Sequence, residues 1–321
     1  MRRRIEFHLP LKSLALAAAL ITLMCVVMTT STDTISNLSS LLQQQPLNST
    51  VTTIQDNSTS AAPPPEIKRI TIKDKVAVIT DTRFTARHIP LILHFHTVLG
   101  NDWPIVYYTS QEVIDEHLEP KNGTNKPSAI WTRAVKEGRI EVRLVPPEFD
   151  LGSRDGVNLY MSDPWLWEQL APAQKVLVFQ SDAIICANAH NTVDDFLQWD
   201  FIGATLVKEG RIYNGGLSLR NRVMMLDIIS EGSTYAAETK SGNFTKGGED
   251  VWFSIKMDQR GANLPDSKTA SEFACEYAWH VETQKASLGY HKIHKAAHGS
   301  LEEIAAWCPE IALAAPGALR G

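Results

Sequence analysis

An aspartate directly follows a run of apolar residues. Residues 175–179 read KVLVF, and Gln-Ser-Asp182 comes next. Asp is common at turns where a strand stops, which is one interpretation of Asp182. The other is a ligand for a metal ion or a substrate, because open α/β sheets bind ligands at the carboxyl ends of their strands. The other polar motifs of the chain bear on this choice.

Two glycines follow an amide in the stretch 213–220, which reads YNGGLSLR. Glycine lets a backbone bend or approach a ligand closely, so Gly215 and Gly216 are candidates for the wall of a pocket. Asn214 can donate and accept hydrogen bonds toward the hydroxyl groups of a ligand. An ordinary Gly-Gly turn before a strand is the alternative.

Paired carboxylates follow another pair of glycines in GGEDVWF, residues 247–253. Glu249 and Asp250 are the strongest candidates for chemistry, because the apolar side of the helix that begins with VWFS can anchor them. Two acids at the start of a helix are equally typical of a helix cap, which is worth about 1 kcal/mol and involves no chemistry. A fourth polar stretch, GYHK at 289–292, contributes His291 and Lys292.

Strands and helices alternate through the part of the chain that contains these motifs. The β-branched and apolar runs predict strands at 75–80, 103–110, 140–146, 175–182 and 200–206. Stretches with helical spacing lie at 86–100, 111–118, 158–170 and 223–230. The alternation predicts a mainly parallel sheet covered on both faces by helices. We expect one domain over 68–309, followed by a tail at 310–321.

Several function classes are excluded. The first strand is followed by TDTRFTARH rather than the G-x-G-x-x-G of a dinucleotide-binding fold, and Walker A and G-x-S-x-G sequences are missing. A net charge of -5 and a pI near 6.1 give no basic footprint for nucleic acid.

The N-terminus predicts a membrane anchor. A basic segment, 1–12, precedes the uncharged stretch 13–30, which is near the lower length limit for a spanning helix and would leave the N-terminus cytoplasmic. A cleaved signal peptide is the alternative. The polar stretch 31–67 is too poor in apolar residues to fold alone and reads as a disordered stem. Sequons begin at Asn37, Asn48, Asn57, Asn122 and Asn243. This arrangement is the plan of a single-pass type II Golgi membrane protein with its catalytic domain in the lumen.

Three cysteines, Cys186, Cys275 and Cys308, follow the membrane segment, which holds Cys25. An oxidising lumen permits one disulfide among the three, and the sequence leaves the pairing open.

Taken together, the four stretches resemble the nucleotide-sugar glycosyltransferases of the GT-A fold, and more narrowly a fungal family of uncharacterised glycosyltransferase-like proteins. The resemblance covers roughly residues 75–295 and implies a three-layer α/β/α sandwich. It implies a divalent metal, Mn²⁺ or Mg²⁺, held by Asp182 and His291. GT-A enzymes usually carry a D-x-D at this strand end, whereas Asp182-Ala183-Ile184 has no second carboxylate. His294 and His298 compete with His291, and a structural histidine is the alternative.

The resemblance also implies the roles of the other residues. Asp250 would be the general base on the acceptor hydroxyl, with Glu249 beside it, and Lys292 would contact the diphosphate. The donor site would comprise Asp81, Arg83, Ser181, Asn214, Gly215, Gly216 and Lys292. Arg154 is a weaker phosphate candidate, and Asn158 and Ser162 match polar positions of the family.

The implied activity is transfer of a sugar from a nucleotide-sugar donor to a glycan or glycoprotein acceptor. The Glu-Asp pair favours inversion, although the GYHK segment leaves retention open. A non-catalytic, lectin-like protein on the same fold is the main alternative. A metal-dependent hydrolase is a second, for which the sequence offers few His and Asp ligands.

Overall fold

The computed structural model describes residues 69–119, 128–276, 287–292 and 301–315. All of them belong to the second of two units into which the chain divides, Pro64–Gly321. The predicted cytoplasmic segment, membrane anchor and stem lie outside the described residues and stay predictions. None of the helices in the described ranges combines the length and the hydropathy that a membrane-spanning segment requires.

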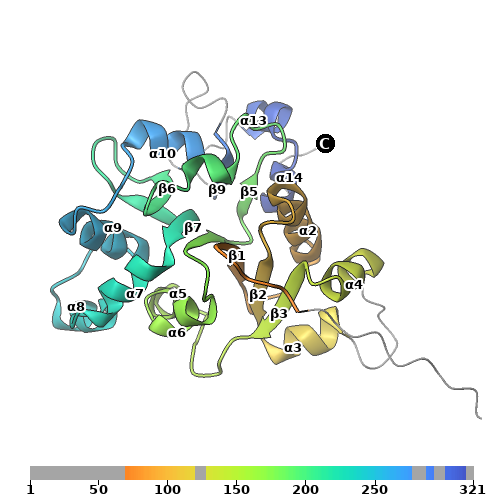
Figure 1. The fold of residues 1–321 in the computed structure, drawn as a ribbon, viewed down its shortest axis with the longest axis horizontal. Helices are drawn as coiled ribbons and strands as arrows, with labels where there is room; N and C mark the ends of the chain where they lie inside the picture. The colour runs from red at the N-terminus through yellow and green to blue at the C-terminus, as the bar shows by residue number, and fades with distance from the viewer. Residues whose placement is uncertain (1–68, 120–127, 277–286, 293–300, 316–321) are drawn as a thin grey trace, which may run out of the picture. The chain divides into compact units, whose positions relative to one another are not determined.

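A six-stranded sheet forms the centre of this unit (Figure 1). Its strand order is β3-β2-β1-β4-β7-β6. The strands are β1 (Lys75–Thr80), β2 (Ile105–Thr109), β3 (Ile140–Leu144), β4 (Lys175–Phe179), β6 (Phe201–Thr205) and β7 (Tyr213–Asn221). The pairs β3–β2, β2–β1 and β1–β4 are parallel, whereas β7 is antiparallel to both of its neighbours. The predicted mostly parallel sheet is confirmed.

The register of β1 and β4 explains how distant polar residues come together. The two strands are parallel neighbours, with Val78 opposite Val178, and their central residues are buried. Both strands therefore end at the same edge of the sheet. Asp81 follows one of them and Ser181 and Asp182 follow the other, so the residues after two apolar runs lie side by side.

Helices connect the strands, and Figure 1 shows α5 to α9 grouped on one side of the sheet and α2, α13 and α14 on the other. The helices after the first two strands are α2 (His88–Leu99), α3 (Gln111–Val113), the π-helix η1 (Ile114–Leu118) and α4 (Ala129–Lys136). The middle of the chain forms α5 (Arg154–Met161), α6 (Pro164–Gln169), the 3₁₀-helix η2 (Val193–Phe196), α7 (Arg222–Ser230) and α8 (Tyr235–Ser241). The last helices are α9 (Glu249–Gln259), α10 (Ser267–Phe273), α13 (Leu301–Trp307) and α14 (Ile311–Ala314).

The single helix predicted over 158–170 is wrong, because the chain breaks there into α5 and α6. The break follows from Asp163-Pro164: proline fits the first turn of a helix, where its missing N–H is not needed. The Asp163 side chain accepts a hydrogen bond from the Trp165 amide at 2.8 Å and caps the new helix.

A second, three-stranded sheet brings the C-terminal part of the chain to the same edge. Its order is β5 (Ala183–Ile185), β9 (Gly289–His291) and β8 (Ala274–Cys275). β9 is antiparallel to β5 and parallel to β8, with His291 opposite Ala183. Strands of two or three residues carry no periodic signal, and the sequence did not predict this sheet.

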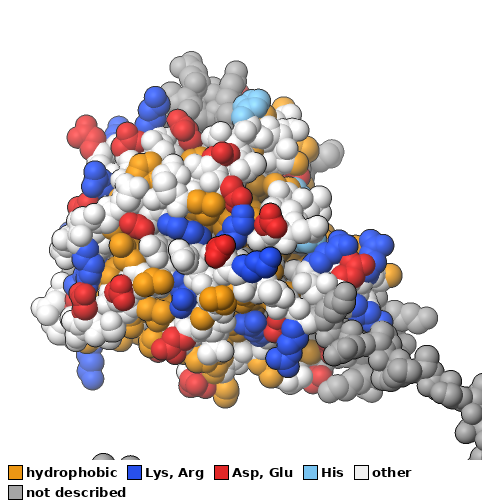
Figure 2. Space-filling model, viewed as in Figure 1, with side chains coloured by type: hydrophobic (Ala, Val, Ile, Leu, Met, Phe, Trp, Pro, Cys, Tyr) orange, Lys and Arg blue, Asp and Glu red, His pale blue; other side chains and the backbone are white. Residues whose placement is uncertain are grey.

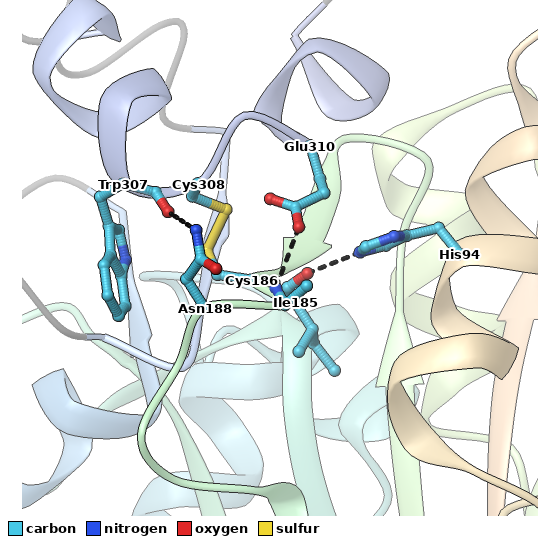
Figure 3. The surroundings of a disulfide bond; sticks show 8 residues. His94, Ile185, Cys186, Asn188, Trp307, Cys308 and Glu310 are labelled. Carbon is cyan, nitrogen blue, oxygen red and sulfur yellow. Dashed lines mark hydrogen bonds between the residues drawn. A yellow bond between two sulfur atoms is a disulfide. The ribbon is translucent and has the colours of Figure 1, made fainter.

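A disulfide joins Cys186, which follows β5, to Cys308, which lies between α13 and α14 (Figure 3). Hydrogen bonds beside it run from the Ala187 amide to Glu310 and from the Asn188 side chain to the Trp307 carbonyl. The pairing left open by the sequence is therefore Cys186–Cys308, while Cys275 is buried outside it. The stretch predicted as a tail begins with α14, whose Ile311 is buried.

Candidate functional site

A cleft of about 660 Å³ lies where the strands of the central sheet end, and every predicted site residue lines it. These residues are Asp81, Arg83, Ser181, Asp182, Asn214, Gly215, Gly216, Glu249, Asp250, His291 and Lys292. Arg154 and Asn158 line it as well. The four motifs thus converge on one site, and the role of each residue stays a prediction.

Asp81 is held in place at the end of β1. Its carboxylate accepts hydrogen bonds from the Arg83 amide at 2.9 Å and from the Ser181 hydroxyl at 3.0 Å, and it lies 3.2 Å from Nε2 of His88. Burial favours the neutral acid, but the bonds to His88 and Arg83 outweigh it and hold the pKa of Asp81 below its usual value. Asp81 is therefore a fixed, charged acceptor.

Asp182, Gln180 and His291 meet at one point of the cleft. Nε2 of His291 lies 3.2 Å from Oδ1 of Asp182 and 3.1 Å from Oε1 of Gln180. The Lys292 amide donates to the Asp182 carbonyl at 3.0 Å, which continues the pairing of β5 with β9. Strand pairing therefore brings the GYHK motif to Asp182. The competing His294 and His298 lie outside the described residues.

A second carboxylate faces the other nitrogen of the His291 ring. Oε2 of Glu276 lies 3.5 Å from Nδ1, and both side chains are almost fully buried. Burial disfavours the imidazolium, but the carboxylates of Asp182 and Glu276 together raise the pKa of His291. If Nε2 binds a metal ion, a carboxylate at Nδ1 favours the tautomer with its proton on Nδ1.

The two glycines of YNGGLSLR are required by close packing. A Cβ on Gly216 would lie 2.1 Å from Nε2 of His291, and one on Gly215 would lie 2.4 Å from Nη2 of Arg220. The Gly216 amide donates to the Asn214 side chain at 2.7 Å, and its carbonyl accepts from the Gln180 amide at 2.8 Å. This first part of β7 is thereby held against Gln180, which directly follows β4.

Asp250 lies in the first turn of α9 and faces Gly215 of β7. Its Oδ2 accepts the Gly215 amide at 2.9 Å, and its Oδ1 accepts the Val251 amide at 2.8 Å. Each carboxylate oxygen has a second lone pair, so both can still accept a hydrogen bond from a ligand. The helix N-terminus itself is capped from outside, since Oδ1 of Asn158 accepts the Glu249 amide at 3.3 Å.

Glu249 lies beneath the cleft surface and is paired with Arg220. The two carboxylate oxygens accept hydrogen bonds at 2.9 and 3.0 Å from the two terminal nitrogens of Arg220. Burial raises the pKa of Glu249, and the arginine charge acts in the opposite direction. The geometry makes Glu249 part of the framework that supports Asp250.

Cationic groups surround the carboxylates of the cleft. Arg83 has a side chain 77% exposed, and Arg154 is also exposed at the first position of α5. Lys292 has a φ of 50°, in the left-handed backbone region that residues other than glycine rarely adopt. On the face of the molecule shown in Figure 2, Lys and Arg alternate with Asp and Glu. The sequence therefore supplies cations at specific points rather than a basic surface.

Several residues of the site were missed at the sequence level. Gln180 and Asp182 have the spacing of a D-x-D motif, with an amide in place of the first carboxylate. The prediction placed the missing second carboxylate after Asp182, at Ile184, and so passed over Gln180. Arg220 ends the YNGGLSLR motif, but the sequence analysis assigned it no role. Nothing local marked Glu276, because its relation to His291 depends on the pairing of β8 with β9.

The side chains around His291 fit a divalent ion. Among the described residues there is no group of three His, Cys, Asp or Glu side chains arranged as a metal site, so any fit involves the Gln180 amide oxygen. Adjacent ligands at about 2.1 Å from an octahedral ion lie about 3 Å apart. The 3.1 and 3.2 Å separations of Gln180 Oε1 and Asp182 Oδ1 from His291 Nε2 match that spacing. The two oxygen donors suit Mg²⁺ or Mn²⁺.

Residues 139–291 match a family described as "Protein of unknown function (DUF5672)", which is less than half of the chain. The match includes Asp182, Asn214, Asp250 and His291. No curated protein matches the sequence.

Solved structures similar to the chain include two glycosyltransferases. The mannosyltransferase PcManGT from Pyrobaculum calidifontis, in complex with GDP-Man and Mn²⁺, has a TM-score of 0.36 and 11% identity, over 63% of this chain and 57% of its own. The apo-form glycosyltransferase GlyE of Streptococcus pneumoniae TIGR4 has a TM-score of 0.38 and 12% identity, over 68% of this chain and 54% of its own. The chain thus spans little more than half the length of either. We base the functional proposal on the residues of the cleft.

Proposed function

We propose that the protein is a glycosyltransferase of the GT-A type, which transfers a sugar from a nucleotide-sugar donor to a glycan or glycoprotein acceptor. The observation that carries the proposal is the convergence of Asp182, His291, Lys292, Asn214 and Asp250 on one cleft. A nucleotide sugar needs a group that binds its diphosphate, acceptors for its hydroxyls and a base for the incoming alcohol. The cleft has candidates for each.

Donor binding is assigned to the side where β1, β4 and β9 end. Asp182, His291 and Gln180 would hold a divalent ion, which would neutralise the charge that develops on the diphosphate as it leaves. Lys292 adds a compact positive charge for the phosphates. The fixed carboxylate of Asp81 and the exposed Arg83 lie beyond Ser181 and are assigned to the nucleotide.

Proton transfer is assigned to Asp250. As the acceptor oxygen forms a bond to the anomeric carbon, its proton passes to the Asp250 carboxylate. The bond between the anomeric carbon and the diphosphate oxygen breaks, and the electron pair leaves with the diphosphate. A base on the acceptor fits an inverting transfer. The amides of Gly215 and Val251 fix the orientation of the carboxylate, so one lone pair of each oxygen stays available.

We assign the protein to the Golgi membrane, with residues 13–30 as its anchor and the folded unit in the lumen. The Cys186–Cys308 disulfide supports this, since disulfides persist in oxidising compartments. Full-length protein should resist carbonate extraction from membranes. Recovery of a secreted chain that begins near Thr32 would show instead that the segment is a cleaved signal.

Donor hydrolysis and transfer across a panel of nucleotide sugars, with and without Mn²⁺, test the activity. We expect turnover of at least one donor and stimulation of it by the metal. Binding of a glycan without turnover of any donor would favour the lectin-like alternative. Turnover that is insensitive to both Mn²⁺ and a chelator would contradict the metal site and leave the transferase proposal intact.

A further inference from the structure

An arginine–glutamate pair lies fully buried beneath the cleft. Arg220 is on β7 and Glu249 is the first residue of α9. The two side chains form parallel hydrogen bonds of 2.9 and 3.0 Å, and they are 0% and 7% exposed. Such two-pronged geometry requires the planar guanidinium, and a lysine could not reproduce it.

The surroundings of Arg220 hold its side chain in one orientation. The guanidinium lies over the rings of Trp167 and Phe201, at 5.6 and 4.8 Å from their centroids. Its Nε donates to the Ser218 hydroxyl at 2.9 Å, and that hydroxyl donates to the Gly215 carbonyl at 2.9 Å. Nη2 also donates to the Gly215 carbonyl at 3.3 Å. The arginine therefore links the helix to the Gly215 backbone in the first part of β7.

The same pair reaches Asp250 through one backbone group. Glu249 directly precedes Asp250, and the Gly215 amide donates to the Asp250 carboxylate at 2.9 Å. A Cβ on Gly215 would lie 2.4 Å from Arg220 and 2.9 Å from Glu249. Gly215 is thus held on its carbonyl side by Arg220 and on its amide side by Asp250.

Stability alone gives little reason for such a pair, because apolar side chains of similar volume often replace a buried ion pair at no cost. We propose that Arg220 and Glu249 are positioning residues, which fix the Gly215 amide and so aim the Asp250 carboxylate into the cleft. Their importance for turnover rests on the proposed function, in which Asp250 is the base. Glu249 itself does not contact the acceptor.

Hydrogen exchange of the Gly215 amide tests the positioning without reference to activity. In Glu249→Gln, which keeps the shape and removes the charge, we expect this amide to exchange at least about 10-fold faster than in the wild type, because the Gly215 backbone is held less firmly. Glu238→Gln is the matched control. It weakens the ion pair between Glu238 of α8 and Lys256 of α9, the helix that also carries Glu249, and it should leave the exchange rate of the Gly215 amide unchanged. Unchanged exchange at Gly215 in folded Glu249→Gln would overturn the proposal.

A milder variant covers the case in which Glu249→Gln does not fold. Ser218→Ala removes the hydroxyl between Arg220 and the Gly215 carbonyl and keeps both charges. We expect a smaller increase in exchange, about threefold, confined to the part of β7 around Gly215. Exchange equal to that of the wild type would count against the proposal.

A kinetic cycle separates positioning from a general structural effect. Glu249→Gln should lower kcat by about 10- to 100-fold and leave the donor KM within about threefold, as a small displacement of a catalytic group does. In the Asp250→Asn background the same change should cost nothing further. If Glu249→Gln lowered kcat by the same factor in the wild type and in Asp250→Asn, the proposal would be overturned. If the wild type turns over no donor, the proposed function fails, while the exchange measurement still decides whether the pair holds Gly215.

Discussion

The two walls of the cleft are held in place in different ways. The strand-end wall consists of Asp81, Gln180 to Asp182, His291 and Lys292. Within it Ser181 contacts Asp81, and His291 contacts Gln180 and Asp182. The helix-end wall consists of Asn214 to Gly216 with Glu249 and Asp250, and it is supported from beneath by Arg220. The polar side chains of the first wall meet at the cleft, where a ligand can bind them, whereas the second wall rests on the buried pair of Arg220 and Glu249. Changes in the first should therefore alter affinity, and changes in the second should alter turnover and stability.

The largest effect is expected at the helix-end wall. Asp250→Asn should lower transfer by about 10² to 10⁴-fold, the usual contribution of a general base, and leave nucleotide affinity nearly unchanged. Initial rates and calorimetric titration of the nucleotide check both. Asp258→Asn, on the exposed side of α9, is the control and should keep full activity. Full activity in Asp250→Asn would mean that the base lies elsewhere and that Glu249 and Asp250 only cap a helix.

The free energy of unfolding should distinguish the Arg220–Glu249 ion pair beneath this wall from the nearby Lys256–Glu238 ion pair. Arg220→Met leaves the buried Glu249 without its counter-charge and should lower the free energy of unfolding by about 3–5 kcal/mol. Lys256→Met removes a partly exposed partner of Glu238 and should cost about 1 kcal/mol or less. Denaturant titration of both variants gives the comparison. Equal losses would show that burial of Arg220 has no special energetic weight.

On the strand-end wall, metal affinity is the sensitive quantity. Glu276→Gln removes the charge that faces Nδ1 of His291 and should weaken Mn²⁺ binding by about 10- to 100-fold, the usual effect of a residue that orients a metal ligand. Electron paramagnetic resonance of free Mn²⁺ measures this without a turnover assay. Glu141→Gln, on strand β3 and outside the cleft, should bind like the wild type. Unchanged affinity in Glu276→Gln would show that the carboxylate does not orient His291.

The difference between the walls also explains what the sequence could predict. The strands β1, β2 and β4 were found because they are continuous apolar runs, and the residues after them were candidates by position. Asp182 could therefore be named from its place after a strand and Asp250 from the paired carboxylates after two glycines, whereas Asp81 was named through the family resemblance. The short strands β5, β8 and β9 have no such pattern, and the pairing that brings His291 to Asp182 could only be inferred from a family resemblance.

Contacts beneath the surface were the least predictable. Nothing within YNGGLSLR indicates that Arg220 turns inward to Glu249, since the two are 29 residues apart and arginine is usually exposed. The need for Gly215 was likewise attributed to a ligand, although the atoms that exclude a Cβ belong to Arg220 and Glu249. A sequence shows that glycine is present, and only the fold shows what approaches it.

The smallest effect is expected on the loop that leads into the helix-end wall. Asn243 and Thr245 are exposed there, while Phe244 packs against Tyr235 with ring centroids 5.8 Å apart. The sequon is thus presented to solvent, and in a secreted or lumenal chain we expect a glycan on Asn243. Asn243→Gln should remove one glycosidase-sensitive step in gel mobility.

Because the Asn243 side chain faces solvent, its loss should change the free energy of unfolding by no more than about 0.5 kcal/mol and leave transfer unaffected. Thr245→Ala should give the same mobility as Asn243→Gln, whereas Thr245→Ser keeps the sequon and should keep the glycan. A drop in turnover for Asn243→Gln would mean that the glycan, or the loop that carries it, acts on Asp250. In that case the exposed loop around Asn243 would help to position the helix-end wall, together with the buried Arg220.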